Sequence, residues 1–293
     1  MEKKSVKGWI YILPSVLIMC VFTLYPLIRA ILMSFSENYS LIKGTGTAFG
    51  LGNYQELFTD KYFLKAIRNT SIYVVFVVPL SITFSLIIAV LINNSGKLKG
   101  LFQTVYFLPY VTSVIAIGIV WRWIYNSQYG LLNYFLGLFG ISPIGWLNET
   151  QYSLPALIIF SIWKSMAFDI LIFLAGLQTI SKDVYDAAKV DSTPAWRVFF
   201  RITVPGIAPM IAYAFIMGII SAFKVYNEVF SLFKGSAGPA NSAITVVYYI
   251  YDQFYNNFNY GVAAAAAVVL FLIILGLTML QRGISRLVKN KNS

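Results

Sequence analysis

The chain of 293 residues has no histidine, one cysteine and only 11% charged residues. Without histidine, imidazole-dependent catalytic triads and Cys/His zinc sites are excluded, and the lone Cys20 excludes a disulfide within the chain. A soluble domain carries about 25% charged residues, whereas 58% of this chain is hydrophobic. The polar shell of a soluble core is therefore missing, and the composition also excludes intrinsic disorder.

Acidic residues are scarce as well, with eleven Asp and Glu against twenty-two Lys and Arg. No pair of carboxylates has helical ligand spacing inside an apolar segment, so a carboxylate metal site is not expected. Gly44 to Gly50 is rich in glycine but lacks the lysine of a nucleotide-binding loop. The chain is predicted to hold no metal and no cofactor of its own.

Long apolar runs are abundant. A bilayer core about 30 Å thick needs roughly 20 apolar helical residues, and the sequence predicts six such spans, the fourth of which contains Lys164 and Asp169. The uncharged stretch 123–148 is interrupted by glycine and proline, which favours a short interfacial helix there. The prediction is an all-α membrane helix bundle, a single transmembrane domain over 1–293, with spans at about 9–31, 69–94, 102–125, 155–180, 205–228 and 260–281.

Basic residues give the orientation, because Lys and Arg concentrate in cytoplasmic segments. With six spans and both termini in the cytoplasm, thirteen lie inside and five outside. The excess charge then meets anionic lipid, and a nucleic-acid partner is not needed. The inner set is Lys3, Lys4, Lys7, Lys97, Lys99, Lys182, Lys189, Arg197, Arg201, Arg282, Arg286, Lys289 and Lys291; the outer set is Lys43, Lys61, Lys65, Arg68 and Lys234.

The inner segment 181–205 has helical spacing and both charge and aromatic residues. Ser181 can cap a first helix, and Thr193 with Pro194 can start a second, which Pro205 ends. The pattern predicts a helix-turn-helix elbow that projects into the cytoplasm. An alternative is an amphipathic helix lying at the membrane surface with its arginines extended toward water.

Within this elbow, Asp186-Ala187-Ala188, then Asp191, then Val204-Pro205 resemble the cytoplasmic loop of ABC importer permeases. That loop reads Glu-Ala-Ala, Asp-Gly and Ile-x-Leu-Pro at the same spacing. Asp186 replaces the usual Glu and Ser192 the usual Gly; if the turn needs a positive φ, Ser192 is strained by about 1 kcal/mol. The resemblance implies a coupling helix that binds a separate ATPase through Asp186, Ala187, Ala188, Asp191, Ser192, Trp196, Arg197 and Pro205.

The C-terminal part is similar to carbohydrate-importer permeases of the maltose and multiple-sugar type, through Gly238-Pro239-Ala240-Asn241, the run 245–251 and Asn259-Tyr260-Gly261. This resemblance implies a bacterial inner-membrane subunit that works with a second permease, an ATPase dimer carrying ATP and Mg²⁺, and an extracellular solute-binding protein. Loops near 126–153 and 230–260 would accept sugar from that protein. The sequence does not identify the sugar. It also does not show which of the two permeases supplies the sugar site in the membrane.

Ionisable residues within the spans need a partner or water. Lys224 and Glu228 have i,i+4 spacing and are expected to pair on one helix. In the other interpretation, Glu228 lines the translocation path, and the candidate path residues are Tyr226, Asn227, Glu228, Lys164 and Asp169. A self-sufficient secondary transporter or channel is the alternative function and an intramembrane enzyme a third, but the lack of histidine and the few carboxylates disfavour both.

Overall fold

The structure is a computed structural model that describes the backbone of residues 6–291 and the side chains of residues 11–283. Lys3 and Lys4 lie outside the described residues, as do the side chains of Lys7, Arg286, Lys289 and Lys291. The chain forms two compact units. The first unit is Met1–Leu64 with Tyr249–Gly276, and the second unit is Lys65–Tyr248 with Leu277–Ser293.

The first unit begins with α1 (Val6–Met19), the π-turn η1 (Cys20–Leu24) and α2 (Tyr25–Ser34). A hairpin of β1 (Ser36–Glu37) and β2 (Ala48–Phe49) leads to α3 (Gly52–Thr59). The side-chain amide of Asn53 donates to the backbone carbonyls of Ser34 (2.9 Å) and Ser36 (3.0 Å), which fixes the hairpin against the end of α2.

The C-terminal part of the first unit contains the π-turn η5 (Asp252–Asn256) and the start of α15 (Tyr260–Lys291). The Tyr249 hydroxyl donates to the Asp60 carboxylate (2.6 Å), and the side-chain amide of Asn259 donates to the Glu56 carboxylate (3.0 Å). The alanines that were expected to pack closely are buried from Ala263 to Ala266. Long-range polar contacts and small side chains therefore hold the start of α15 in this unit.

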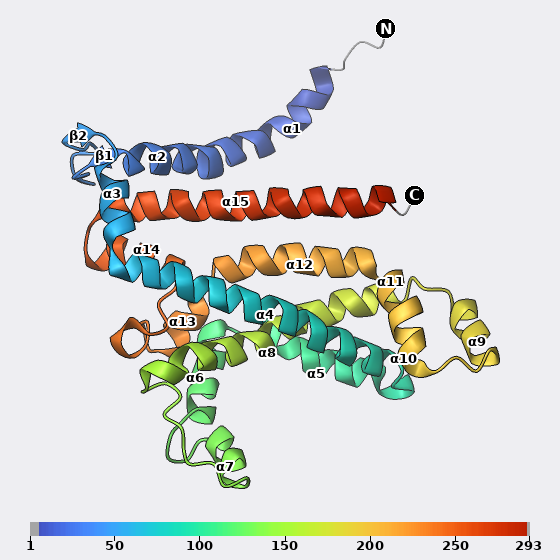
Figure 1. The fold of residues 1–293 in the computed structure, drawn as a ribbon. Helices are drawn as coiled ribbons and strands as arrows, with labels where there is room; N and C mark the ends of the chain where they lie inside the picture. The colour runs from blue at the N-terminus through green and yellow to red at the C-terminus, as the bar shows by residue number, and fades with distance from the viewer. Residues whose placement is uncertain (1–5, 292–293) are drawn as a thin grey trace. The chain divides into compact units, whose positions relative to one another are not determined.

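The second unit is organised around α8 (Thr150–Leu177), whose Phe160 and Phe173 side chains are fully buried. Figure 1 shows α6 (Val114–Ile124), α7 (Leu131–Gly137) and α13 (Asn227–Leu232) near the start of α8, and α9 (Lys182–Val190) beyond its end. The remaining helices are α4 (Lys61–Asn93), η2 (Gly96–Leu98), α5 (Lys99–Val111), α10 (Ala195–Val198), η3 (Phe199–Thr203), α11 (Val204–Gly206), α12 (Ala208–Phe223), η4 (Pro239–Asn241) and α14 (Val246–Tyr251).

Four helical segments within the described residues are long and apolar enough to cross a membrane: Tyr11–Ser34, Lys61–Asn93, Thr150–Leu177 and Tyr260–Gly283. Two bent pairs raise the total to six if each pair counts as one span. The pairs are Gly96–Val111 with Val114–Ile124, bent by 102°, and Ala195–Gly206 with Ala208–Phe223, bent by 69°.

The segment expected as one helix over 102–125 is thus two helices. Pro109 removes one helical hydrogen bond, and the chain turns where Thr112 and Ser113 are extended, with ψ of 144° and 129°. After the bend, α6 packs on α13, and Gly118 lies so close to Ser231 that a Cβ would have no room. The contact between these two helices outweighs continuity of the apolar run.

Candidate functional site

The expected elbow is present, and its first limb is α9. The Ser181 hydroxyl accepts a hydrogen bond from the Asp183 amide (3.3 Å), which confirms the predicted cap. At the other end, the Thr193 amide donates to the Ala188 carbonyl (2.9 Å) and the Ser192 amide to the Lys189 carbonyl (3.0 Å). These two bonds define a Schellman motif, whose turning residue is left-handed. Ser192 has φ of 51°, the conformation for which glycine is preferred.

The second limb differs from its expected boundaries by one residue at each end. Pro194 is the cap residue instead of Thr193, and the helix continues past Pro205 to Gly206. Proline lacks the amide that would bond to the carbonyl four residues earlier, and the helix widens to the π-turn η3 immediately before Val204-Pro205. Tyr185 and Thr203 hydroxyls lie 3.2 Å apart and connect the two limbs.

The two alanines of the elbow lie on different sides of α9. Ala187 is exposed, whereas Ala188 is only 7% exposed and lines a cavity of about 540 Å³ between the elbow and the ends of α4 and α8. Ala187 is therefore the alanine that can meet another protein. Large apolar side chains are also exposed on the elbow, and the most exposed are Val190 (85%), Trp196 (62%) and Phe200 (63%).

Two of the contacts on the elbow involve charged side chains that are close neighbours in the sequence. Lys189 contacts the Asp186 carboxylate at 2.7 Å, and this hydrogen bond and charge hold the pKa of Asp186 below its ordinary value. The Arg197 guanidinium lies 5.4 Å from the centre of the Trp196 ring. Asp191 is exposed at the C-cap of α9. The elbow thus presents exposed apolar residues with fixed charges at its rim.

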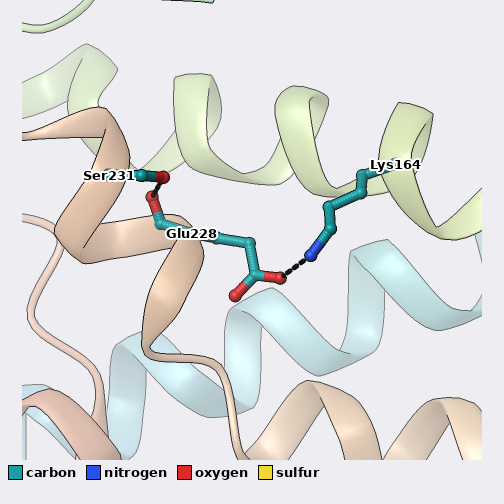
Figure 2. Close-up of polar contacts among 3 residues, drawn as sticks. All are labelled: Lys164, Glu228 and Ser231. Carbon is teal, nitrogen blue, oxygen red and sulfur yellow. Dashed lines mark hydrogen bonds and ion pairs between the residues drawn. The ribbon is translucent and has the colours of Figure 1, made fainter. Parts of the chain in front are cut away.

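A second cluster lies along α8 and α13. The Lys164 ammonium contacts the Glu228 carboxylate at 2.6 Å, with side chains 21% and 18% exposed (Figure 2). The expected pair between Lys224 and Glu228 is wrong, because α12 ends at Phe223 and α13 starts only at Asn227. The two residues are therefore not on consecutive turns of one helix. Figure 2 also shows Ser231 donating to the Glu228 carbonyl (3.2 Å) from the next turn of α13.

The ion pair borders a cavity of about 420 Å³. Four of the five predicted path residues line it, namely Lys164, Asp169, Asn227 and Glu228. Tyr226 is the exception, since its ring packs on Phe230 (5.6 Å) and Tyr248 (6.2 Å).

Other residues of this cavity were not predicted. Tyr110 and Phe168 stack with ring centres 5.3 Å apart, and Ser81 on α4 lines the cavity together with Asp169. The sequence contains too many aromatic residues to single out this pair. Ser81 could have been found only by knowing which turn of α4 faces Asp169. The cavity therefore combines an aromatic platform with paired charges and hydroxyl groups.

Known proteins match the sequence and the fold of this chain. The family model for the binding-protein-dependent transport system inner membrane component matches residues 81–290. Lactose transport system permease protein LacF of Rhizobium radiobacter is 35% identical, over 94% of this chain and 93% of LacF. Arabinooligosaccharides transport system permease protein AraP of Bacillus subtilis (strain 168) is 32% identical, over 96% of this chain and 89% of AraP.

The fold is also that of a solved structure, the bacterial alginate ABC transporter in complex with alginate pentasaccharide-bound periplasmic protein. The TM-score is 0.84 at 23% identity, over 98% of this chain and 96% of that chain. The fold and the site therefore define the class of this protein, which is a helical membrane component with a projecting loop. The chain belongs to the family of binding-protein-dependent transport system inner membrane components, which confirms the resemblance to carbohydrate ABC importer permeases and the multi-pass location in the inner membrane.

Proposed function

We propose that this chain imports a sugar as one of two permease subunits of an ATP-binding-cassette transporter, forming half of the translocation pathway. An ATPase dimer carries ATP and Mg²⁺ and docks on the elbow, and an external solute-binding protein delivers the sugar. The elbow and both chain termini face the cytoplasm. The sugar-permease names of the relatives support the substrate class, and no chemistry is assigned to this chain itself.

The observation that carries the proposal is the exposed surface of the elbow. Ala187 leaves room for a partner to approach the α9 backbone, while Val190 and Trp196 would otherwise keep apolar area in water. Burying such area contributes about 25 cal/mol per Å². The ion pair of Asp186 with Lys189 fixes charge at the edge of this surface. A groove on another protein satisfies all three features, whereas a lipid surface has no use for a small-residue gap.

The cavity beside the Lys164–Glu228 pair is the proposed section of the sugar pathway. Aromatic ring faces such as Tyr110 suit the apolar faces of sugars, and Asn227 with the paired charges offers donors and acceptors for hydroxyl groups. The cavity volume of about 420 Å³ is within the usual range for small-molecule sites, roughly 300–1,000 Å³.

The elbow is joined along the chain to helices that border the sugar cavity, and this connection would couple the ATPase to the sugar pathway. The first limb joins α8 through residues 178–181, and the second continues into α12 through Ile207. Movement of the docked ATPase would therefore be transmitted to the two helices that border the sugar cavity. A cavity of about 540 Å³ lies between the elbow and the ends of α4 and α8.

Co-purification and uptake test the proposal. Ala187→Lys places a charged side chain in the docking contact and is expected to reduce capture of the ATPase at least tenfold, or more than about 1.4 kcal/mol, and to abolish ATP-dependent sugar uptake in vesicles. Ala48→Lys is the matched control, because Ala48 is exposed in the β1–β2 hairpin. Control and unmodified protein should retain the ATPase.

Two results would contradict the proposal. Sugar uptake by this chain alone in liposomes, without an ATPase, would identify a secondary transporter or channel. Equal capture of the ATPase by Ala187→Lys and Ala48→Lys would show that the elbow is not the docking surface.

A further inference from the structure

The cavity of about 540 Å³ beside the elbow lies at the ends of two helices that are long and apolar enough to cross a membrane. Asn93, the last residue of α4, lines it together with Leu177, the last residue of α8. We call this space the elbow cavity, and its other walls are α9 and the second limb of the elbow. The elbow cavity shares no lining residue with the sugar cavity, so it is a separate site.

The lining of the elbow cavity changes from apolar to polar along the chain. Val90 lies one turn before the end of α4 and lines the cavity with Leu177, so the part next to the membrane-crossing helices is apolar. Polar side chains follow at the helix end and beyond it, with Asn93 on α4 and Lys182 at the start of α9. A phospholipid has the same change of polarity, from its acyl chains to its headgroup.

Positive charge exceeds negative charge at the elbow cavity. Lys182 and Lys189 line it, Asp186 is the one carboxylate among its described lining residues, and this carboxylate already contacts Lys189. The Lys99 ammonium donates to the side-chain oxygen of Asn93 (2.9 Å), which brings a third cation next to the lining. The ion pairs found in the described part of the chain include neither Lys99 nor Lys182. The cavity is therefore complementary to an anion.

A neutral donor adds to this complementarity. The side-chain oxygen of Asn93 is occupied by Lys99, so the remaining capacity of Asn93 is its NH₂ group. Ammonium and amide donors together suit phosphate oxygens, which accept charge-assisted hydrogen bonds. Lys99 is also half-buried, so its charge is less screened by water than that of a fully exposed lysine.

We infer that the elbow cavity binds the phosphate headgroup of an anionic phospholipid from the cytoplasmic leaflet, with the start of an acyl chain against Val90 and Leu177. This inference rests on the proposed function, which places the elbow in the cytoplasm. Basic pockets between membrane helices on that side bind anionic headgroups. The cavity volume of about 540 Å³ is within the range of small-molecule sites, roughly 300–1,000 Å³. A soluble anion would use the lysines but leave the apolar wall in water, which favours the lipid.

The experiment counts the phosphatidylglycerol and phosphatidylcholine molecules that stay on the whole transporter, by native mass spectrometry after release from mixed-lipid nanodiscs. The unmodified complex should retain phosphatidylglycerol in preference. Lys99→Gln with Lys182→Gln is expected to weaken this retention by about tenfold or more, because each lysine near anionic lipid contributes a factor of roughly five. Lys97→Gln is the matched control, because Lys97 is exposed in η2 and does not line the cavity.

A second pair of variants changes the shape of the cavity without changing its charge. Val90→Trp places a large ring at the apolar wall and should lower phosphatidylglycerol retention by a comparable factor. Leu91→Trp is its control, because Leu91 is the next residue of α4, is 64% exposed and does not line the cavity. Co-purification of the ATPase first shows that each variant assembles.

Three results would overturn the inference. Equal losses in Lys97→Gln and in the double lysine variant would indicate a general attraction to anionic membrane surfaces. Unchanged retention in Val90→Trp would show that no lipid occupies the cavity. Binding of inorganic phosphate that the double variant loses, while it keeps phosphatidylglycerol, would assign the lysines to a soluble anion. Failure of the unmodified complex to take up sugar with ATP would instead count against the proposed function, because lipid retention is measured without transport.

Discussion

The Lys164–Glu228 pair can be tested by two double-mutant cycles. The atoms are 2.6 Å apart and the side chains about one-fifth exposed. Exposed pairs contribute up to about 1 kcal/mol, and loss of one partner from a fully buried pair costs roughly 3–5 kcal/mol. An intermediate coupling energy of about 2 kcal/mol is therefore expected.

The variants are Lys164→Met, Glu228→Gln and the double change, with thermal unfolding of the purified chain in detergent as the assay. Each single change leaves a half-buried charge without its partner, so each should lower the melting temperature by roughly 4 °C or more. The double change should cost less than the sum of the singles by about 2 kcal/mol, because no unpaired charge remains.

Lys224→Met is the matched control, because Lys224 lines the same cavity but lies in the break between α12 and α13. Its effect should add to that of Glu228→Gln within about 0.5 kcal/mol. Stronger coupling of Glu228 to Lys224 than to Lys164, or additivity in both cycles, would refute the assignment of the pair.

Two glycine exchanges test backbone geometry. Ser192→Gly should relieve the strain of the positive φ, stabilise the elbow by about 1 kcal/mol and slow hydrogen exchange in α9 about fivefold. Ser192→Ala should bring no such gain. Equal rates of hydrogen exchange in the two variants would contradict a strained turn. Gly118→Ala should lower the melting temperature by an amount equivalent to about 1–3 kcal/mol, because its methyl would meet Ser231. Gly100→Ala is the control, because a methyl there has open space. Equal effects of the two changes would contradict the close contact of α6 with α13.

Local sequence signals predicted the elbow well. Ser181 and the residues around Ser192 determine where α9 begins and ends through hydrogen bonds between near neighbours, so the chain itself carries the information. The position of η3 was missed, although a proline follows two residues after it, as Pro26 follows η1. A π-turn before proline is a local signal that could have been used.

Features that depend on tertiary packing were not predictable. The bend at Thr112 and Ser113 depends on the contact of Gly118 with Ser231, more than one hundred residues away in sequence. Likewise, the uncharged run ends at Phe223, where α12 stops, but the i,i+4 spacing of Lys224 and Glu228 suggested a continuing helix, and nothing in the sequence indicated that Glu228 reaches α8 instead. The charges were recognised as needing partners, but the identity of each partner is a property of the packed helices.

The interruptions at 112–113 and 224–226 also constrain what surrounds this protein. A helix break frees backbone carbonyls, and acyl chains offer no donor to satisfy them. One such carbonyl, that of Val225, accepts the Thr245 hydroxyl at 2.9 Å. Each break must therefore be shielded from hydrocarbon by protein or by water, and at Val225 the buried Thr245 of this same chain provides the shield.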